Sequence, residues 1–503
     1  MSNILGISSG FHDASASVIS WDGEIVFAGH SERYSKKKND PDIHPDLIKE
    51  VMDWDIDSIG YYERPWMHNF QKIRSGQYGL TPWTTRGVLK SQLGDNASKL
   101  LNKTPLSCYP HHLSHAAAGF QTSPFSEAAV VVIDAIGELD TISIYHAKYD
   151  QDGQAKYEKV WGQKYPHSIG LFYSAITDLI GLKPMEDEYV TMGMAAWGSD
   201  LGAVSMKHEF FSDISIGELW ENVHIGISQD DPRRKTFPYV LDNKANVAAC
   251  AQRVVEEAIL CIMRRAKELV NSDNLVFMGG VSLNCVANSR LGVIFPNIWI
   301  MPNPGDSGSS LGAAALVYGK RLQWKNAYLG HNIDGDYPVT KIIDHLMKDK
   351  IVGVASGRAE FGPRALGNRS LLADPRGDDI KDAVNKIKKR QQFRPFAPAI
   401  LEEHVHDYFD MPKGFDKSPY MQTVARVQHP KLYPAITHVD GTARVQTVPN
   451  DGSGFRKLLE AWYVWSGCPM LLNTSLNIRG EPMVNDRLDA DRFQKKYGVV
   501  VCS

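Results

Sequence analysis

Two parts of the chain share one pattern of apolar runs and turn residues. In the first, residues 3–10, 14–20 and 24–30 are rich in apolar and β-branched residues, and the letters WDGE mark a turn before the last run. In the second, an apolar run over residues 128–137 ends in a turn, and residues 140–147 return as another run. Each pattern predicts a β-hairpin. Because the pattern occurs twice, we expect an internally duplicated α/β domain.

A long helix followed by a strand is predicted between residues 245 and 280. Apolar residues recur in the helix at a spacing of three or four, and the strand over residues 275–280 ends at Gly279 and Gly280. Small residues at such a turn let the backbone approach a nucleotide. Glycine pairs follow many strands, so this indication is weak by itself. The apolar helix positions are Val255, Ile259, Ile262, Met263, Ala266 and Leu269.

A boundary between two domains is predicted near residue 343. A new helix over residues 341–347 and a strand over residues 351–355 begin there. We place the first domain at residues 1–342 and the second, smaller α/β domain at residues 343–503. Within the second, residues 411–454 mix Lys, Pro, Gly and Thr with short strand-like runs. This stretch is expected to form an insertion or mobile cover outside the core.

Composition agrees with two globular domains that act on a small molecule. A chain of 503 residues exceeds what one core usually organises. Its net charge of -3 does not predict tight nucleic-acid binding over the whole surface. The six cysteines include no CxxC pair, which predicts free thiols and no cysteine-ligated zinc. No segment resembles a signal peptide or a membrane span, so we expect a cytoplasmic protein without a membrane partner.

Two histidines and two aspartates form a candidate metal site. His111 and His115 stand four positions apart, which places both rings on one face of a helix. Asp134 ends an apolar strand, and Asp306 lies in a second glycine-rich turn. Two imidazoles and two carboxylates suit a hard or borderline metal. The alternative is that the histidines satisfy hydrogen bonds in the core while Asp134 caps a turn. Asp306 shifts the balance toward a metal.

Arginines, lysines and amides gather in three segments of the second domain. The planar guanidinium of arginine matches phosphate or carboxylate oxygens, and neighbouring glycines open backbone N–H groups to the same anion. The segments therefore predict a pocket for a small, highly charged substrate. The alternative is a solvated basic face with structural salt bridges. The residues are Arg358, Arg364, Arg369, Arg376, Lys388, Arg390, Arg394, Asn473, Ser475, Asn477 and Arg479.

The first domain offers a candidate base and a candidate phosphate ligand. His12 follows the first strand and can act as a general base, and Lys38 can hold a phosphate as a point charge. The alternatives are a turn-capping pair of His12 with Asp13 and a surface run of lysines. The acids at residues 186–188 are candidates for binding a metal or a cationic acceptor, with a solvated loop as the alternative.

Ten motifs together resemble a known family. In order along the chain they are HDASA, SERYS, HHLSH, IDAIGE, SIGLFYSAITDLIGLKPMEDEY, GGVSLN, PGDSG, GRAEFGPRALGNRS, FRPFAP and NTSLNIRGEP. The set resembles the NodU/CmcH-type O-carbamoyltransferases over nearly the whole chain. The resemblance implies a larger N-terminal domain with the actin-like ATPase fold and a smaller C-terminal domain with a YrdC-like fold.

The resemblance also implies a two-step reaction. Carbamoyl phosphate and ATP would give carbamoyl-adenylate in the smaller domain, and a substrate hydroxyl would take the carbamoyl group in the larger one. An arginine-rich pocket that excludes water would bind carbamoyl phosphate and protect the adenylate. A metal would clamp phosphate oxygens without redox chemistry, with iron favoured and Mg²⁺ as the alternative.

Roles for individual residues follow from their places in the motifs. His111, His115, Asp134 and Asp306 would hold the metal, His12 would activate the acceptor hydroxyl, and Lys38 would lie on phosphate. Gly279, Gly280 and Asn284 would contact the adenosine. Contacts to carbamoyl phosphate and the adenylate would come from Arg358, Arg364, Arg369, Lys388, Arg390, Arg394 and Arg479, with Asn473 and Ser475 beside them.

The chain departs from the family pattern in three places. Ala135 stands where glycine is usual, Val190 and Thr191 stand where a lysine is common, and the chain ends at Ser503, sooner after the last motif than the family predicts. These changes leave nucleotide details open and remove no proposed catalytic group.

Several questions about function stay open at this point. Acceptors could be antibiotic sugars, nodulation oligosaccharides or hydroxymethylated pyrimidines, free or in nucleic acid. A homodimer is one candidate assembly. The alternative functions are a tRNA threonylcarbamoyl transferase and a non-catalytic nucleotide sensor with an actin-like fold.

Overall fold

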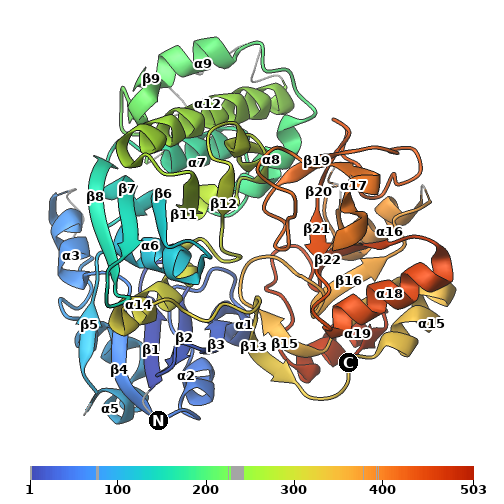
Figure 1. Ribbon diagram of the computed structural model, residues 1–503, viewed down its shortest axis with the longest axis horizontal. Coiled ribbons are helices and arrows are strands. Elements are labelled where there is room, and N and C mark those ends of the chain that lie inside the picture. The colour runs from blue at the N-terminus through green and yellow to red at the C-terminus, as the bar shows by residue number, and fades with distance from the viewer. Residues whose placement is uncertain are drawn as a thin grey trace.

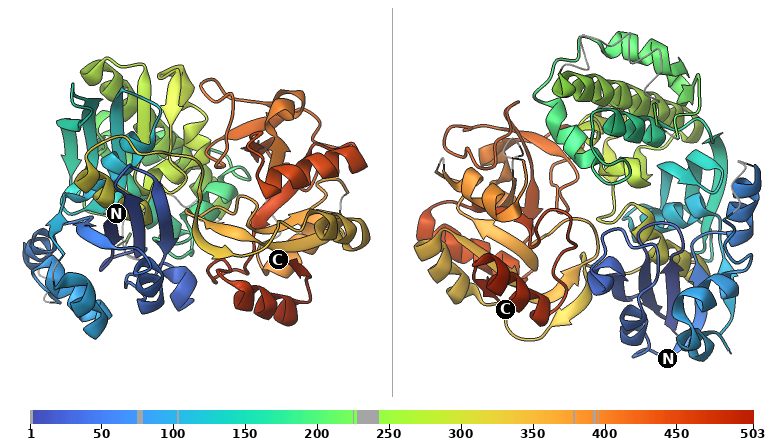
Figure 2. Two further views of the ribbon diagram at one scale, coloured as in Figure 1. Left: turned by 60° about the horizontal axis from the view of Figure 1, so that its bottom comes forward. Right: turned by 180° about the vertical axis from the view of Figure 1, so that it is seen from behind.

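The chain folds into two α/β domains that lie side by side (Figure 1). This computed structural model describes residues 3–74, 79–102, 104–224, 226–227, 243–377, 379–391, 394 and 396–503. The first domain runs from blue through green to yellow in Figure 1, and the second runs from gold through orange to red. Figure 2 shows the same side-by-side arrangement from two other directions.

The first domain contains two five-stranded sheets with the same topology. One has the order β3-β2-β1-β4-β5, and the other has the order β8-β7-β6-β11-β12. In each sheet the first three strands along the chain pair antiparallel, and the last two add in parallel. The topology confirms the predicted duplication. The strands are β1 (Asn3–Ser8), β2 (Ser15–Ser20), β3 (Ile25–His30), β4 (Ile56–Tyr61), β5 (Leu106–Cys108), β6 (Glu127–Gly137), β7 (Asp140–Tyr149), β8 (Ala155–Lys164), β11 (Asn274–Met278) and β12 (Asn297–Trp299).

Helices α6 (His111–Thr122) and α14 (Ser309–Tyr318) join the two sheets. Helix α14 packs on β1 and on α6, and α6 packs on β6. Glycine makes the close approach feasible, because a Cβ at Gly312 would collide with the backbone of Ser114, and a Cβ at Gly6 would collide with that of Ser310. The helix that bears the two histidines is therefore fixed between both sheets.

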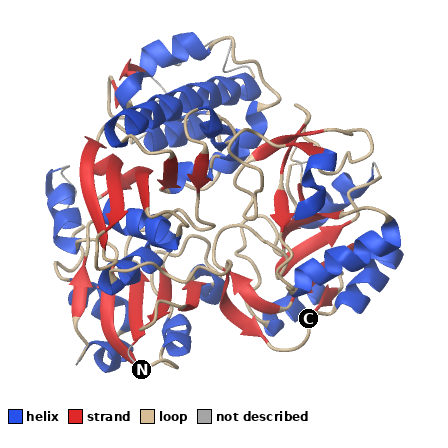
Figure 3. Cartoon of the chain, viewed as in Figure 1, coloured by secondary structure: helices blue, strands red, loops and turns tan. Residues whose placement is uncertain are grey.

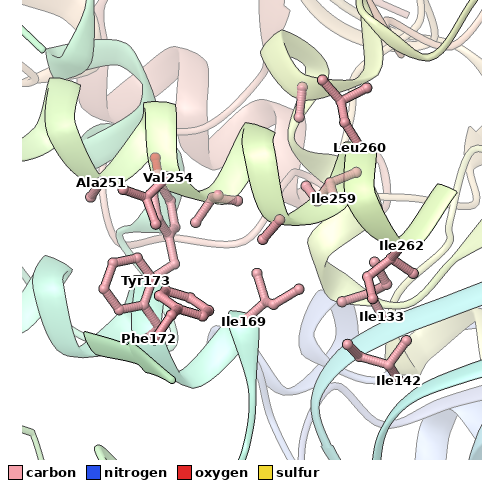
Figure 4. Close-up of a cluster of buried hydrophobic side chains, with 14 of the residues drawn as sticks. Ile133, Ile142, Ile169, Phe172, Tyr173, Ala251, Val254, Ile259, Leu260 and Ile262 are labelled. Carbon is pink, nitrogen blue, oxygen red and sulfur yellow. The ribbon is translucent and has the colours of Figure 1, made fainter. Parts of the chain in front are cut away.

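The predicted long helix is confirmed as α12 (Lys244–Val270), which covers the second sheet together with α7 (Ile169–Leu179). Figure 4 shows the core between them, where Ile133 and Ile142 from the strands meet Ile169, Phe172 and Ile262 from the helices. Burying such side chains contributes about 1.5–3 kcal/mol each. This core anchors the strand that ends near Asp134.

The second domain is built on one mixed sheet with the order β21-β17-β22-β16-β14-β23. The predicted boundary at residue 343 falls within a helix, α15, and β13 already pairs with β15. Helices lie outside the sheet, and loops gather between the two domains (Figure 3). The elements are β13 (Tyr328–Ile333), α15 (Val339–Asp349), β14 (Ile351–Ala355), β15 (Gly357–Glu360), β16 (Arg369–Ala373), α16 (Asp379–Lys388), β17 (Ala397–Leu401), α18 (Gly454–Ser466), β22 (Met470–Ser475), α19 (Arg487–Tyr497) and β23 (Val501–Cys502).

The expectation that residues 411–454 lie outside the core is wrong. Ala435, Ile436 and Val445 are fully buried in the core of the second domain. The stretch also supplies β19 (Val424–Val427), β20 (Thr442–Arg444) and β21 (Gln446–Val448), and β21 pairs with β17 of the main sheet. These strands have three or four residues each, too few to produce a clear alternating pattern.

Remaining first-domain elements are short or peripheral. They include α1 (Glu32–Ser35), α2 (Pro45–Val51), α3 (Pro65–Arg74), α4 (Thr85–Leu93), α5 (Asp95–Leu101), α8 (Glu188–Ala195), α9 (Ala203–Phe210), β9 (Phe211–Asp213), β10 (Glu218–Leu219) and α13 (Cys285–Asn288). Within the described ranges no helix has the length and apolar character needed to cross a membrane. All six cysteines are unpaired.

Candidate active site

A cavity of about 1000 Å³ lies between the two domains. Both domains line it, and most of the predicted site residues do so. From the first domain these are His12, Lys38, Asp134, Gly280, Asn284 and Asp306, and from the second they are Arg364, Lys388, Arg390, Arg394, Asn473, Ser475 and Arg479. Residues predicted from separate motifs therefore share one space.

The four predicted metal ligands come together at the wall of this cavity. Helix α6 supplies His111 and His115, β6 supplies Asp134, and the turn before α14 supplies Asp306. One nitrogen or oxygen from each residue lies within 4.8 Å of the others. His115 Nε2 is 3.1 Å from Asp134 Oδ2 and 3.3 Å from Asp306 Oδ1.

Contacts on the far side of each ring turn the histidines toward this cluster. His115 Nδ1 donates to the carbonyl of Pro304 at 3.0 Å, and His111 Nδ1 faces Glu63 Oε2 at 3.5 Å. Both Nε2 atoms are thereby directed at the carboxylates, as in metal sites where a second group fixes the tautomer. Asp134 Oδ2 is buried, and although His115 Nε2 lies 3.1 Å away, this oxygen accepts no well-directed hydrogen bond from the described residues, which leaves a lone pair for a cation. The donor set fits a hard or borderline metal.

Charges within the cluster compensate one another. Burial would raise the pKa of Asp134, but His111 and His115 outweigh it and hold that pKa well below its usual range. In turn, burial would lower the pKa of His111, but Asp306, Asp134 and Glu63 raise it well above the ordinary value.

His12 lies in the turn between β1 and β2 and faces the same cavity. Its Nδ1 is 3.0 Å from Asp13 Oδ2. Burial lowers the pKa of His12, but the hydrogen bond with Asp13 and the charges of Asp13, Asp306 and Asp134 raise it to about 9. A cation beside those carboxylates would offset part of this effect.

The opposite wall of the cavity carries a cluster of cations. Arg364 comes from the loop after β15, Lys388 from the end of α16, and Arg444 from β20. In the part of the chain that the structure describes, Arg364, Arg394 and Arg444 form no ion pair with a carboxylate. Burial and the charge of Arg444 lower the pKa of Arg364 to about 9, and burial with two neighbouring arginines lowers the pKa of Lys388 well below its usual value. Among the described residues, no carboxylate in contact balances the charges of these three arginines.

Two residues that the sequence analysis did not single out also belong here. Arg444 lines the cavity, and its buried Nε has no hydrogen-bond partner among the residues that the structure describes. The Tyr189 ring stands between the two domains, with Lys38 Nζ 5.4 Å and Arg394 Cζ 4.7 Å from its centre. Arg444 was not predicted because it lies within residues 411–454, which were expected to form a cover outside the core. In the FRPFAP motif, Phe393 and Pro395 lie outside the described residues.

The structure gives different places to Gly279 and Gly280, which were both predicted to contact the nucleotide. Gly280 lines the cavity, but Gly279 does not. Gly279 has φ +87°, and a Cβ added there would collide with the backbone of Ile133. Its N–H donates to the carbonyl oxygen of Pro304 at 2.9 Å. The structure therefore places Gly279 in strand packing. Asn284 faces the cavity and exchanges two 3.0 Å hydrogen bonds with Gln252.

Arg358 and Arg369 do not line the cavity, so the expectation that they contact substrate is corrected. Arg358 donates to the carbonyls of Val26 at 2.6 Å and Leu329 at 2.7 Å. Arg369 is 0% exposed, and its guanidinium donates hydrogen bonds to backbone carbonyls, including that of Asn485 at 3.0 Å. Both arginines tie strands and loops together.

The acids at residues 186–188 do not join the metal cluster. Glu188 accepts hydrogen bonds of 2.6 Å from Ser174 Oγ and from the Met185 N–H, which stabilises the loop before α8. Asp187 lies 3.7 Å from the guanidinium of Arg479 and links the two domains. Of the two interpretations offered for these acids, the structure favours a loop role for Glu188.

Comparison with known proteins decides the family. Residues 71–315 match the family domain described as Carbamoyltransferase N-terminus, and residues 343–501 match the one described as Carbamoyltransferase C-terminus. The chain belongs to the carbamoyltransferase family. This carbamoyltransferase is 30% identical to the nodulation protein NolNO of Sinorhizobium fredii, over 97% of this chain and 77% of that protein. It is 26% identical to the 3'-hydroxymethylcephem-O-carbamoyltransferase of Amycolatopsis lactamdurans, over 97% and 95% of the two chains.

An uncharacterized Synechocystis protein is 34% identical to this carbamoyltransferase, over 98% of this chain and 94% of that protein. The resemblance inferred from the motifs is thus confirmed, and the protein is an enzyme of the carbamoyltransferase type. Solved structures with partial likeness include HypF from T. kodakarensis, with a TM-score of 0.36 and 11% identity over 63% of this chain and 47% of that one. The dehydratase component A of Acidaminococcus fermentans has a TM-score of 0.34 and 14% identity over 63% and 98% of the two chains.

Proposed function

We propose that this carbamoyltransferase forms carbamoyl-adenylate from carbamoyl phosphate and ATP in its second domain and passes the carbamoyl group to an acceptor hydroxyl in its first. The observation that carries the proposal is the single cavity, which joins the cation cluster to the histidine and aspartate cluster. A reactive intermediate made at one wall can reach the other without entering bulk water.

The cation cluster suits the first step. Carbamoyl phosphate and ATP both bring phosphate oxygens, and Arg364, Lys388, Arg394 and Arg444 offer several charge-assisted donors. Formation of the mixed anhydride requires a carbamate oxygen to attack the α-phosphorus of ATP. Carbamoyl phosphate must therefore first lose phosphate to water, and the attack then releases pyrophosphate. Fixed cations stabilise the charge that develops on these oxygens.

The second step belongs to the first domain. His12 is placed to accept the proton of the acceptor hydroxyl as its oxygen attacks the carbamoyl carbon, and AMP leaves. His111, His115, Asp134 and Asp306 would hold the metal, for which iron is our choice and Mg²⁺ the alternative. When bound there, the cation supplies positive charge to the adenylate phosphate and offsets the carboxylates that raise the pKa of His12.

Three finer assignments belong to the same proposal. The duplicated first domain is taken as an actin-like nucleotide-binding fold in which Gly280 and Asn284 approach the adenosine. The mixed sheet of the second domain is taken as YrdC-like. Unpaired cysteines support a reducing compartment, and we assign the protein to the cytoplasm.

The test is pyrophosphate and phosphate release from ATP and carbamoyl phosphate by the metal-loaded protein. We expect pyrophosphate that depends on carbamoyl phosphate, and a carbamoyl mass on one member of a panel of sugars, antibiotics and hydroxymethylpyrimidine nucleotides. Folded, metal-loaded protein that releases no pyrophosphate would overturn the proposal. AMP release that requires threonine and bicarbonate would instead indicate a threonylcarbamoyl transferase, and nucleotide binding without turnover would indicate a sensor.

A further inference from the structure

The loop that carries Arg364 is held by a buried carboxylate of its own domain. This loop connects β15 to β16 and contains the GPRALGN letters. Glu360 Oε1 accepts hydrogen bonds from three backbone N–H groups, those of Leu366 at 2.8 Å, Asn368 at 2.9 Å and Arg369 at 3.1 Å. The Glu360 side chain is 1% exposed, so water does not compete for these bonds.

The carbonyls of the same loop are also occupied. Asn473 Nδ2 donates to the carbonyl of Ala365 at 3.0 Å, while Gln446 Nε2 and Tyr328 Oη both donate to that of Leu366 at 2.9 Å. The backbone on the C-terminal side of Arg364 is therefore fixed by the second domain. Its N-terminal side needs a separate anchor.

The first domain provides this anchor through hydrogen bonds to Gly362, two residues before Arg364. His30 Nε2 accepts the Gly362 N–H at 2.9 Å, and the Arg33 guanidinium donates to the Gly362 carbonyl at 2.9 Å. The exposed fractions of His30 and Arg33 are 6% and 2%. Gly362 has φ +149°, and a Cβ there would lie 2.6 Å from the carbonyl oxygen of Pro302. Only glycine allows this contact between the domains.

Stability alone does not account for Arg33. Among the described residues it has no ion pair within 4.0 Å, and its Nε is buried without a hydrogen-bond partner. Burial lowers the pKa of Arg33, although Glu360 and Glu32 act in the opposite direction. An apolar side chain of similar size would avoid this desolvation cost. What the guanidinium provides is a directed bond to one carbonyl.

We propose that His30 and Arg33 of the first domain are positioning residues that aim Arg364 of the second domain at the anion in the cavity. Among the described residues no carboxylate pairs with Arg364 to orient it, so its direction depends on the backbone that His30 and Arg33 hold. The first domain thus controls the carbamoyl phosphate site of the second. This inference rests on the proposed function for the identity of the anion and on geometry alone for the contact.

The experiment compares His30→Asn with His30→Gln in the full-length protein. The glutamine amide can reach the position of Nε2 and accept the Gly362 N–H, whereas the asparagine amide lies near the position of Nδ1 and cannot. Tyr420→Phe is the control, because it removes one other hydrogen bond at the domain junction, to Trp324 Nε1 at 2.9 Å. Pyrophosphate release gives KM for carbamoyl phosphate and kcat, and calorimetric titration with inorganic phosphate measures anion binding without turnover.

We expect His30→Asn to raise KM for carbamoyl phosphate and to weaken phosphate binding about tenfold, as for one misplaced charge-assisted bond. His30→Gln and Tyr420→Phe should stay within about twofold. A purely structural role would lower the amount of active protein and kcat without shifting KM or phosphate affinity. If folded His30→Asn binds phosphate as tightly as the wild type, the inference is wrong. If phosphate binding follows the expected pattern while the wild type releases no pyrophosphate, the positioning role stands and the proposed function fails.

Discussion

The two charged clusters that face the cavity are stabilised in opposite ways. In the first domain, two histidines and two aspartates sit within 4.8 Å of one another, and their opposite charges compensate. In the second, burial and then the neighbouring cations lower the pKa values of Arg364, Arg390 and Arg394, and Arg364, Arg394 and Arg444 have no carboxylate partner among the described residues. The charges of the first cluster therefore largely balance one another within the protein, whereas the second cluster carries a repulsion that a bound anion would relieve.

The supports of the two clusters differ as well. His111, His115 and Asp134 stand on a helix and a strand that pack in the core of the first domain. Arg364 stands on a loop whose direction depends on hydrogen bonds from both domains. Substitutions in the two clusters should therefore impair different reaction steps and shift the stability of the protein in different directions.

The largest expected effect comes from Asp306→Asn, which removes one carboxylate charge from the first cluster. Carbamoyl transfer to the acceptor should fall roughly 100- to 1,000-fold, as when a preorganised charge is lost from a site. Pyrophosphate release that depends on carbamoyl phosphate should stay within a few-fold of wild type, because the cation cluster is intact. The measurements are the mass of the carbamoylated acceptor and the pyrophosphate yield.

Asp140→Asn is the matched control for that change. Asp140 lies outside the cluster and pairs with Lys159, with 2.6 Å between Oδ2 and Nζ. It should leave both steps unchanged. Equal losses of transfer and pyrophosphate release in Asp306→Asn would mean that the two clusters do not serve separate steps.

An intermediate effect is expected from Arg364→Ala. KM for carbamoyl phosphate should rise about 10- to 100-fold, because a charge-assisted contact is lost. In phosphate-free buffer the thermal midpoint should rise by about 2 °C, because one of several mutually repelling cations is gone. His115→Ala in the first cluster should lower the midpoint, since it leaves buried carboxylates without their partner.

Arg376→Ala serves as the control for the cation cluster. Arg376 is bound to Asp374 at 2.8 Å, so its loss should not raise the midpoint or change KM for carbamoyl phosphate. The comparison of the two clusters fails if Arg364→Ala destabilises the protein as His115→Ala does.

The smallest expected effect is a pH dependence at the domain contact. Burial and the charge of Arg33 lower the pKa of His30 well below the ordinary histidine value of about 6.5. Below about pH 6.5 the unfolded chain therefore binds a proton that the folded chain rejects, and the stability that His30 contributes above that pH is lost as the pH falls. Between pH 6.5 and 5, the unfolding free energy of the wild type should fall relative to that of His30→Gln, by at most about 1.4 kcal/mol per pH unit. Denaturant unfolding at several pH values measures it, and a difference that stays constant would contradict the assignment.

Much of the first domain follows from local patterns. The repeated hairpins predicted the duplicated sheets, and helical spacing predicted α12. His111, His115, Asp134 and Asp306 were found for the same reason, because each stands at a helix face, a strand end or a turn whose position the pattern predicts. Period and turn chemistry act within a few residues and are therefore visible in the chain.

The second domain was less accessible to this reasoning. Residues 411–454 were expected outside the core, yet they supply buried Ile436 and the cavity residue Arg444. Arg358 and Arg369 stand in the same motif as Arg364, yet only Arg364 reaches the cavity. Arg358 and Arg369 stand on β15 and β16, and Arg364 stands on the loop between them. Their motif does not distinguish them, because the hydrogen bonds that direct Arg358 and Arg369 away from the cavity come from residues distant in the chain.

The family, the α/β fold class and the residues of the compact charge-balanced cluster can be inferred from the sequence. Only the folded structure shows which arginines line the cavity, that Tyr189 stands between the domains, and that His30 and Arg33 are hydrogen-bonded to Gly362. These contacts join residues that are far apart in the chain. His30 and Gly362 lie 332 positions apart, and no local periodicity records a contact that forms only when the two domains meet.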